Sequence, residues 1–348
     1  MDKFNAKLNN IPPNIILKLS KIDELKGRWT ENTQLSYDIL NKLKKATLVT
    51  STGASTRIEG SEMTDDEVEN YMRGMEVTKL KDRDKQEVKG YFEILKNVFD
   101  SYQTLFLREG TIQNLHRELM KYSDKDKLHL GEYKTKDNKV ALVNEKGEII
   151  KIIFDTTPPY LTKIEMNELI DWTRNAFDTK NFHPLLIIAV FIIEFLCIHP
   201  FEDGNGRMSR ILTNLLLLQN DYSFIPYISH EKIIEENKNE YYLSLRQYQK
   251  NSDNKTILPW ITFFLTVIEG QAIQVLELAK NNYLEFDLSP VQIKIWNYIN
   301  EHKEAGASEM AKIAKLNRAT VNQALQKLMR LKKIKKLYNG PATKYRKI

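Results

Sequence analysis

Twelve residues near the middle of the chain, HPFEDGNGRMSR at positions 199–210, combine side chains suited to binding and transferring a phosphate group. The tripeptide Gly204-Asn205-Gly206 lets successive backbone N–H groups point at one anion, and a helix that begins there adds the positive end of its dipole. Arg207 and Arg210 are three residues apart and share one helix face. Two guanidinium groups on that face suit a polyphosphate better than a single phosphate.

His199 and Asp203 add two functions that phosphate transfer requires. A histidine accepts a proton near neutral pH, and a carboxylate can hold Mg²⁺ that bridges phosphates. Taken singly, each residue also has a structural interpretation, with His199 capping the preceding helix and Asp203 serving as an N-cap. The combined spacing favours a phosphate-binding loop that carries a base.

Two apolar segments must position this loop. Residues 184–198 read PLLIIAVFIIEFLCI, which is too short for a membrane span and contains Glu194, so we predict a buried helix there. A second helix is predicted from about Gly206 to Gln219. The rest of the body is also predicted to be helical, with helices over 66–99 and 232–250 and a capping box of Thr64 and Glu67 before the first of these. The exception is a β-hairpin of Lys139–Val143 and Ile149–Phe154 that turns near residues 145–147. The fold class is therefore mainly α.

The composition is that of a soluble globular protein large enough for two or three domains. The chain has 348 residues, of which 42% are hydrophobic and 28% charged. A single cysteine excludes a disulfide framework and fits a reducing cytoplasm. The polar opening MDKFNAKLNN has no signal pattern. We therefore expect a cytoplasmic protein with no membrane partner.

The C-terminal sixth of the chain is strongly basic. Residues 289–348 contain 14 Lys and Arg but only three Asp and Glu, whereas the rest of the chain is mildly acidic. Helices are predicted at 290–299, 308–314 and 318–331, followed by a hairpin that turns near 339–341. This order resembles a winged helix, in which the third helix enters the major groove of DNA. The candidates for DNA contact are Arg318, Thr320, Asn322, Gln323 and Lys327. A protein contact, or a solvated lysine-rich face, would explain the same charge.

Residues 199–210 match the motif H-x-F-x-[D/E]-G-N-G-R-x-x-R at every specified position, so the chain resembles the Fic family. The resemblance implies transfer of AMP from ATP onto a Tyr, Thr or Ser hydroxyl of a target protein. Self-modification of the chain is included in this expectation. The resemblance also implies that the hairpin within 131–154 is the Fic flap, which holds the target segment. The expected domains are a helical region at 1–110, a Fic core at 111–284 and the winged helix at 285–348. Fic proteins often self-associate, so a homo-oligomer is expected.

The resemblance assigns a role to each residue of the loop. His199 would deprotonate the incoming hydroxyl, Asp203 would hold Mg²⁺, and Phe201 would anchor the loop. The remaining residues bind phosphates: an anion hole is formed by the backbone of Gly204–Gly206 and the Asn205 side chain, and the β- and γ-phosphates are held by Arg207 and Arg210. Asn239 and Tyr241, on a later helix, resemble a segment near the adenosine. Packing of one helix on another explains those two residues equally well.

A second motif lies upstream, at about residues 54–60. One class of Fic proteins has an inhibitory helix of the form [S/T]-x-x-x-E-[G/N] before the core, and Ser55 to Gly60 (STRIEG) fits it. We predict a short helix that Ser55 caps and Gly60 ends. Glu59 would form a charge-assisted pair with Arg210 and occupy the guanidinium that the γ-phosphate needs. This short motif is nonspecific on its own. It becomes more informative because it precedes the 199–210 motif, in the order that this class of Fic proteins has.

Other functions fit parts of the same pattern. A DNA-binding regulator could use a Fic core only to sense a nucleotide, although a sensor needs no base such as His199. Glutamate-assisted removal of AMP from a modified protein is a second alternative. Some Fic variants move phosphocholine or phosphate instead, but the intact loop motif favours ATP as an AMP donor.

Overall fold

A computed structural model describes most of the chain. The described residues are 2–32, 35–75, 82–124, 129–143, 149–251, 255–287, 289–302, 304–314, 316–338, 340 and 343–348. They form a mainly helical protein, as the sequence predicts.

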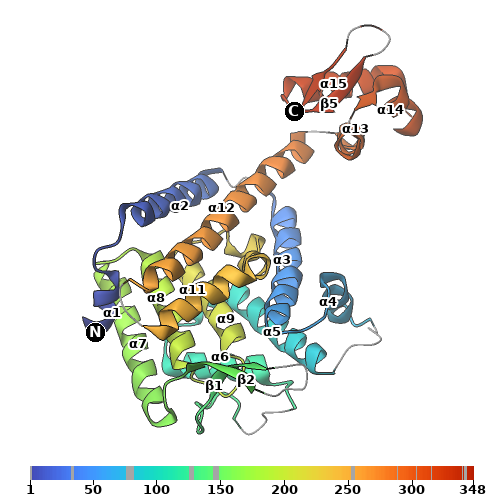
Figure 1. Ribbon diagram of the computed structural model, residues 1–348. Helices are drawn as coiled ribbons and strands as arrows, with labels where there is room; N and C mark the ends of the chain where they lie inside the picture. The colour runs from blue at the N-terminus through green and yellow to red at the C-terminus, as the bar shows by residue number, and fades with distance from the viewer. Residues whose placement is uncertain are drawn as a thin grey trace. The chain divides into compact units, whose positions relative to one another are not determined.

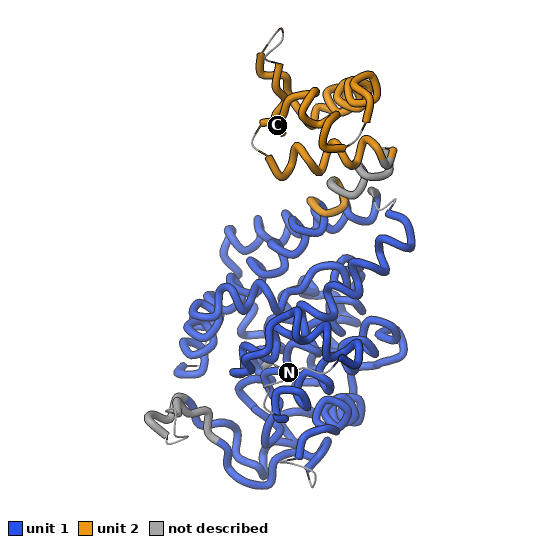
Figure 2. The backbone as a smooth tube through the Cα atoms, turned by 90° about the vertical axis from the view of Figure 1, so that its right-hand side faces the viewer, with its two compact units in different colours: residues 1–276 blue, residues 277–348 orange. Residues whose placement is uncertain are grey.

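The chain divides into two compact units, residues 1–276 and residues 277–348 (Figure 2). The division falls inside the long helix α12 (Ile257–Asp287). Residues 1–110 and the helices that follow them share the first unit. The limits of the core at 111 and 284 remain a prediction from the sequence.

The first unit is built from helices packed around a buried centre (Figure 1). Its elements up to the hairpin are α1 (Asp2–Asn5), η1 (Ala6–Leu8), α2 (Pro13–Asn32), α3 (Tyr37–Ile58), α4 (Asp65–Met72), α5 (Asp82–Ser101), η2 (Tyr102–Thr104) and α6 (Glu109–Met120). After the hairpin come α7 (Pro159–Thr179), α8 (Pro184–Ile198), α9 (Asn205–Gln219), η3 (Ile225–Tyr227), α10 (His230–Glu236), α11 (Lys238–Lys250) and α12.

Helix α8 forms the centre of this unit, because nearly every side chain along it is buried. Its one acidic residue, Glu194, pairs with Lys7 Nζ at 3.0 Å and accepts a hydrogen bond from the Tyr248 hydroxyl. A carboxylate within an apolar helix needs such partners, since an unpaired buried charge is costly. The predicted buried helix is thus confirmed, and it provides a fixed base for the loop that follows it.

The segment that carries the second motif differs from its prediction. Residues 54–60 form no separate short helix, because α3 runs without a break from Tyr37 to Ile58. Ser55 is therefore not an N-cap but lies in the penultimate turn of α3, with its side chain buried. The predicted stop at Gly60 is confirmed: its φ is +102°, and Ser61 N donates to Thr56 O at 3.0 Å. This closes α3 in a Schellman motif and leaves Glu59 at its end.

Two other predicted helices are each interrupted. The continuous helix expected over 66–99 is replaced by α4 and α5, since Gly74, with φ +78°, follows the end of α4. The helix expected over 232–250 divides into α10 and α11 at Asn237, whose φ of −115° and ψ of 35° are not helical. In both places the apolar periodicity continues across the break, so periodicity alone does not reveal it. The capping box of Thr64 and Glu67 at the start of α4 is confirmed.

The predicted hairpin is present as β1 (Lys139–Val143) and β2 (Ile149–Asp155), which pair antiparallel. The register shifts between Val140 and Ala141 and again between Leu142 and Val143. The predicted turn at 145–147 lies outside the described residues. Just before β1, residues 134–138 run beside the 199–210 loop, to which several hydrogen bonds join them.

After the end of α12, the described residues of the second unit form three helices and a small sheet. Its helices are α13 (Pro290–Glu301), α14 (Ala307–Ala314) and α15 (Arg318–Arg330), and its strands are β3 (Ala305–Gly306), β4 (Ile334–Lys336) and β5 (Lys344–Lys347). The antiparallel sheet has the order β3-β5-β4. A buried cluster that includes Trp296, Leu325 and Leu328 forms its core. These elements follow the predicted order, and the tip of the predicted tail hairpin falls partly outside the described residues.

Helix α12 has a property that the sequence reading missed. By length and composition alone, Ile257–Lys280 could cross a membrane. In this structure Ile257, Ile261, Leu265 and Ile268 are fully buried, so one face of α12 packs into the first unit. The expected absence of a membrane partner stays a prediction.

Gly90 provides a test of the close packing of α5 on α6. A Cβ at this position would overlap the backbone oxygen of Leu119. We expect Gly90→Ala to lower the free energy of unfolding by about 1–3 kcal/mol, because backbone atoms cannot move aside cheaply. Gly27→Ala in α2 is the matched control: a Cβ there meets nothing within 4 Å, and it should stabilise by about 0.4–1 kcal/mol. Urea unfolding of both variants measures these changes. Equal urea midpoints for the two variants would contradict the close approach of Gly90 to the backbone of Leu119.

Candidate functional site

Two left-handed residues shape the loop between α8 and α9. His199 caps the C-terminus of α8 with φ 52°, and Gly204 precedes the first turn of α9 with φ 82°. The His199 Nδ1 atom lies 3.4 Å from Leu196 O, and a carbonyl only accepts, so Nδ1 carries the proton. Nε2 is then the basic nitrogen. Burial lowers the pKa of His199 to about 4, and the nearby Lys134 ammonium acts in the same direction. The imidazole is thus neutral at pH 7, as a general base must be.

The loop is braced from within by Asn205. Its Oδ1 accepts from Phe201 N at 3.0 Å, and its Nδ2 donates to Phe201 O at 2.7 Å. Both groups of this buried amide are therefore engaged with the backbone. Nδ2 has a second N–H donor beyond the one that Phe201 O accepts, so the expected role of the Asn205 side chain in an anion hole stays a prediction. The backbone amides of the first turn of α9 remain suited to an anion.

His116, on α6, supports the loop from behind. It stacks on Phe201 with ring centroids 3.7 Å apart, and its Nε2 donates to Asp203 O at 3.0 Å. Its Nδ1 accepts from Gly131 N at 3.1 Å, so the two bonds together define a neutral tautomer. His116 is fully buried. The sequence reading expected Phe201 to anchor the loop but missed this partner, for which an isolated histidine on an apolar helix face is a weak signal.

Arg207 and Arg210 are both 2% exposed, so the two charges are held inside the protein. Arg207 Nη2 donates to Asp203 Oδ1 at 3.3 Å, and its Nη1 lies 3.5 Å from Glu87 Oε2. Arg210 Nε donates to Ser55 Oγ at 2.7 Å, and its Nη2 donates to Ser55 O at 3.0 Å. Within the described part of the chain, Nη1 of each arginine has no hydrogen-bond partner. Two buried donors without acceptors fit the oxygens of an anionic ligand.

Glu59 extends from the end of α3 to Arg210. Its Oε1 accepts from Arg210 Nη2 at 2.8 Å. The same oxygen lies so close to Gly206 that a Cβ there would overlap it. Although burial alone would raise it, the pKa of Glu59 lies below its ordinary value because Arg210 and Arg207 stabilise the carboxylate. The pairing in turn raises the pKa of Arg210 despite the burial of that side chain.

Asp203 lies at the exposed edge of the loop, with 51% of its side chain accessible. Its Oδ1 accepts hydrogen bonds from Gly204 N and Arg207, which leaves Oδ2 for a cation. Nowhere in the described residues do three or more His, Cys, Asp or Glu side chains converge on a metal site. Asp203 therefore suits Mg²⁺ that takes its other ligands from water and phosphate oxygens.

Comparison with known proteins agrees with this geometry. Residues 106–217 match the model of the Fic/DOC family. The chain therefore contains a domain of the Fic/DOC family at these residues. The Fic domain contains α6, the hairpin, α7, α8, the 199–210 loop and most of α9.

Two curated relatives are named as adenylyltransferases. A probable protein adenylyltransferase of Aquifex aeolicus is 35% identical over 81 residues, which are 23% of this chain and 24% of the relative. The protein adenylyltransferase Fic of Nematostella vectensis is 32% identical over 113 residues, which are 32% of this chain and 24% of the relative. This chain thus spans about a quarter of the length of each.

A solved structure matches the chain along most of its length. The crystal structure of a Fic family protein from Desulfovibrio desulfuricans G20 is similar over 97% of both chains, with a TM-score of 0.65 and 23% identity. At this identity the similarity establishes the fold alone.

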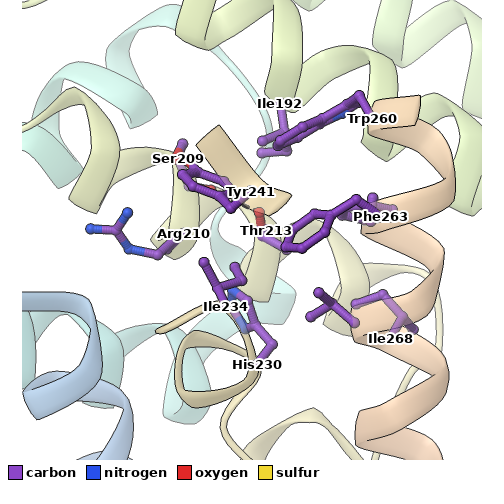
Figure 3. A pocket seen from close by; sticks show the side chains of 12 residues that line it. Ile192, Ser209, Arg210, Thr213, His230, Ile234, Tyr241, Trp260, Phe263 and Ile268 are labelled. Carbon is purple, nitrogen blue, oxygen red and sulfur yellow. Dashed lines mark hydrogen bonds between the residues drawn. The ribbon is translucent and has the colours of Figure 1, made fainter. Parts of the chain in front are cut away.

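The two predicted adenosine residues, Asn239 and Tyr241, differ in burial. Tyr241 is 4% exposed and packs on Trp260 and Phe263, with ring centroids 5.8 and 5.9 Å away. Figure 3 shows it among these side chains and near Arg210, in the lining of a small internal cavity. Asn239 is exposed on α11. Tyr241 thus has the packing role that the sequence reading weighed as its alternative.

Tyr242, the next residue along α11, lies beside the end of α3. Its hydroxyl donates to Ile58 O at 3.5 Å, one residue before Glu59. Burial raises the pKa of Tyr242, and the Glu59 carboxylate adds to the shift. The tyrosine pair at 241–242 signals an aromatic position, but only the direction of each side chain on α11 decides which ring faces the site.

Arg57 holds the Glu59 segment in place and was also missed. Its Nε donates to Glu235 Oε1 at 2.5 Å, its Nη2 pairs with Asp65 at 2.8 Å, and its Nη1 donates to Met63 O at 2.7 Å. These contacts join the last turn of α3 to α10 and to the start of α4. The end of the helix that presents Glu59 is therefore clamped on two sides.

In the second unit, the candidate DNA residues differ in accessibility. Arg318, Asn322 and Gln323 are exposed on α15, whereas Thr320 and Lys327 are half-buried. The Thr320 hydroxyl donates to the N-cap side chain of Asn317 at 2.8 Å, so it is already engaged in capping the helix. Arg318, Asn322 and Gln323 remain the more accessible candidates.

The Glu59–Arg210 pair predicts a pH-dependent contribution to stability. Because the pKa of Glu59 in the folded state is below its ordinary value of 4.5, the contribution is present above that pH and is lost as pH falls through the lowered pKa. Glu59→Gln should destabilise the protein by about 1.5–3 kcal/mol at pH 6–8. The difference from wild type should shrink below about pH 4.5.

Thermal unfolding of both proteins from pH 3.5 to 8 measures this difference. Glu240→Gln, at an exposed position of α11, serves as the control and should change nothing. A difference that stays constant down to the acid limit would show that Glu59 is not paired in solution.

Proposed function

We propose that this chain is a protein adenylyltransferase that moves AMP from ATP to a Tyr, Thr or Ser hydroxyl of a target protein, and that Glu59 restrains it. One observation carries the proposal: a neutral His199 lies in the same loop as Arg207 and Arg210, two buried guanidinium groups that each keep a donor without a hydrogen-bond partner in the described chain. The names of the curated relatives support the same reaction.

In this mechanism His199 Nε2 takes the proton of the incoming hydroxyl. The hydroxyl oxygen forms a bond to the α-phosphorus in line with the bond to the bridging oxygen, that bond breaks, and pyrophosphate leaves. Arg207 and Arg210 hold the β- and γ-phosphates, and the first-turn amides of α9 face the developing charge. The proton on His199 then returns to solvent. Asp203 would hold Mg²⁺, which neutralises phosphate charge when it is bound.

Glu59 restrains this reaction by occupying Arg210. The Nη2 atom that donates to Glu59 Oε1 is then not available to a γ-phosphate, and the carboxylate places negative charge where that phosphate would lie. ATP that enters beside the carboxylate would have its α-phosphate misaligned for in-line attack. The protein target would pair with an edge of the β1–β2 hairpin. A cytoplasmic location and self-association remain predictions.

The restraint is tested by Glu59→Gly and His199→Ala. Incubated with α-labelled ATP and cell lysate, Glu59→Gly should raise label in protein, including in the chain itself, by about tenfold or more, since it frees a charge-assisted contact. His199→Ala in the same background should abolish transfer while ATP binding persists. Glu236→Gly is the matched control, because Glu236 is an exposed glutamate at the end of α10. Mass spectrometry would identify the labelled protein.

Three results would contradict the proposal. Unchanged labelling in Glu59→Gly would remove the restraint, and retained transfer in His199→Ala would remove the histidine from its role. Loss of label from a previously modified protein that depends on Glu59 would instead favour glutamate-assisted removal of AMP.

The second unit supports a further role in binding DNA, possessed by the same chain. It combines a net basic charge with exposed Arg318, Asn322 and Gln323 on one helix and exposed Lys335 on the neighbouring sheet. Such a distribution attracts phosphate backbones.

DNA binding is tested by fluorescence anisotropy with a labelled duplex at several salt concentrations. We expect the affinity to fall steeply with salt, and Lys335→Ala to reduce the slope of log K against log salt by about one. Lys42→Ala, at an exposed position of α3, is the control. If no binding to the duplex is seen at 50 mM salt, a protein partner for this unit is favoured instead.

A further inference from the structure

We propose that Lys134 is a positioning residue for the catalytic base, because it binds the backbone carbonyls of the residues before and after His199. This inference rests on the proposed function. Lys134 lies 65 residues before His199, ahead of the hairpin and outside both sequence motifs. It is 3% exposed.

The side chain of Lys134 uses all three of its ammonium protons. Nζ donates to Ile198 O at 3.0 Å, to Asn138 Oδ1 at 2.9 Å and to Thr156 Oγ1 at 2.7 Å. Ile198 O belongs to the peptide group that precedes His199. The backbone N of Lys134 donates to Pro200 O at 2.8 Å, the carbonyl of the residue that follows His199. One residue therefore holds the chain on both sides of the histidine.

Neighbouring residues extend the same contact along the loop. Asn138 Nδ2 donates to Phe201 O at 2.9 Å, and the amides of Thr135 and Lys136 donate to Glu202 Oε1 at 3.2 and 3.4 Å. Residues 134–138 thus run alongside residues 198–202. The contact also joins the first strand of the hairpin to the loop, since Lys139 opens β1.

The position of His199 depends on this contact for a geometric reason. A left-handed non-glycine residue costs of order 1–3 kcal/mol and persists only where its surroundings over-determine it. Hydrogen bonds to the carbonyls of Ile198 and Pro200 supply that constraint. A displacement of about 1 Å of a catalytic group can cost about a hundredfold in rate.

Lys134 also places a positive charge beside the base. Its three acceptors are neutral oxygens, and the acidic groups Asp137, Glu202 and Glu165 act on it only through space. The charged groups that act on His199 are Lys134, Glu59 and Asp203. The cation favours the neutral form of the imidazole, so the geometric and electrostatic effects of Lys134 act together.

The test compares Lys134→Met and Lys134→Arg in the Glu59→Gly background. With α-labelled ATP, Lys134→Met should slow transfer about a hundredfold while the Kd for ATP, measured by calorimetry, changes by less than about threefold. Lys134→Arg keeps the charge and several donors, so it should retain most of the rate. A purely structural residue would lower the amount of folded protein, ATP binding and turnover together.

A second readout does not depend on transfer. NMR titration of His199, assigned by comparison with His199→Ala, should show a higher pKa in Lys134→Met than in the wild-type chain, because a neighbouring positive charge has been removed. The acid limb of the pH–rate profile should move to higher pH in the same variant. In the Glu59→Gly background, Lys134 and Asp203 are the remaining charges that act on the imidazole.

The outcomes separate the two proposals. If Glu59→Gly transfers no label, the adenylyltransferase proposal fails. The NMR titration of His199 in Lys134→Met still tests the effect of Lys134 on the pKa of that histidine. If Glu59→Gly is active and Lys134→Met matches it in rate and in His199 pKa, the inference is overturned. Should Lys134→Met not fold, Thr156→Val removes one of the three acceptors and should cost about tenfold in rate. A fully active Thr156→Val would then refute the positioning role.

Discussion

A buried guanidinium group governs the arrangement of this site. Arg210 is almost wholly enclosed, and a charge in such a place is tolerated only with partners that compensate for lost water. In this structure Ser55 and Glu59 at the end of α3 supply them, and the proposed reaction would replace the carboxylate by a phosphate. The same requirement for negative charge therefore underlies both the resting state and the binding of ATP.

The loop that carries the base is held by a second set of contacts, independent of α3. Asn205 closes it from within, His116 supports it from α6, and residues 134–138 hold it from the segment before the hairpin. Glu59 acts on the phosphate-binding arginine, whereas these contacts act on the histidine and its neighbours. The proposed restraint and the proposed catalysis thus depend on different contacts within the first unit.

The sequence predicted those parts of the site that lie within a short stretch of chain. The spacing of residues 199–210 identified His199, Asp203 and the two arginines, and the order of the motifs indicated Glu59. It could not predict that Asn205 turns back to Phe201, or which of Tyr241 and Tyr242 is buried, since both depend on side-chain direction. Lys134 and Arg57 were missed because their partners lie 64 and 178 residues away. The apolar periodicity of a sequence indicates which face of a helix is buried. It does not indicate which distant group a polar side chain will bind.

The continuity of α3 changes what removing the N-terminal region would do. The helix that presents the restraining glutamate also presents Ser55, whose hydroxyl and carbonyl receive two of the hydrogen bonds of Arg210. The proposed restraint by Glu59 and the support of the Arg210 side chain are therefore provided by the same helix. Removing this helix would therefore remove the partners of Arg210 together with Glu59 and leave a buried cation without support. Under the proposed restraint, an activating change would have to move the Glu59 side chain away from Arg210 while α3 stays in place.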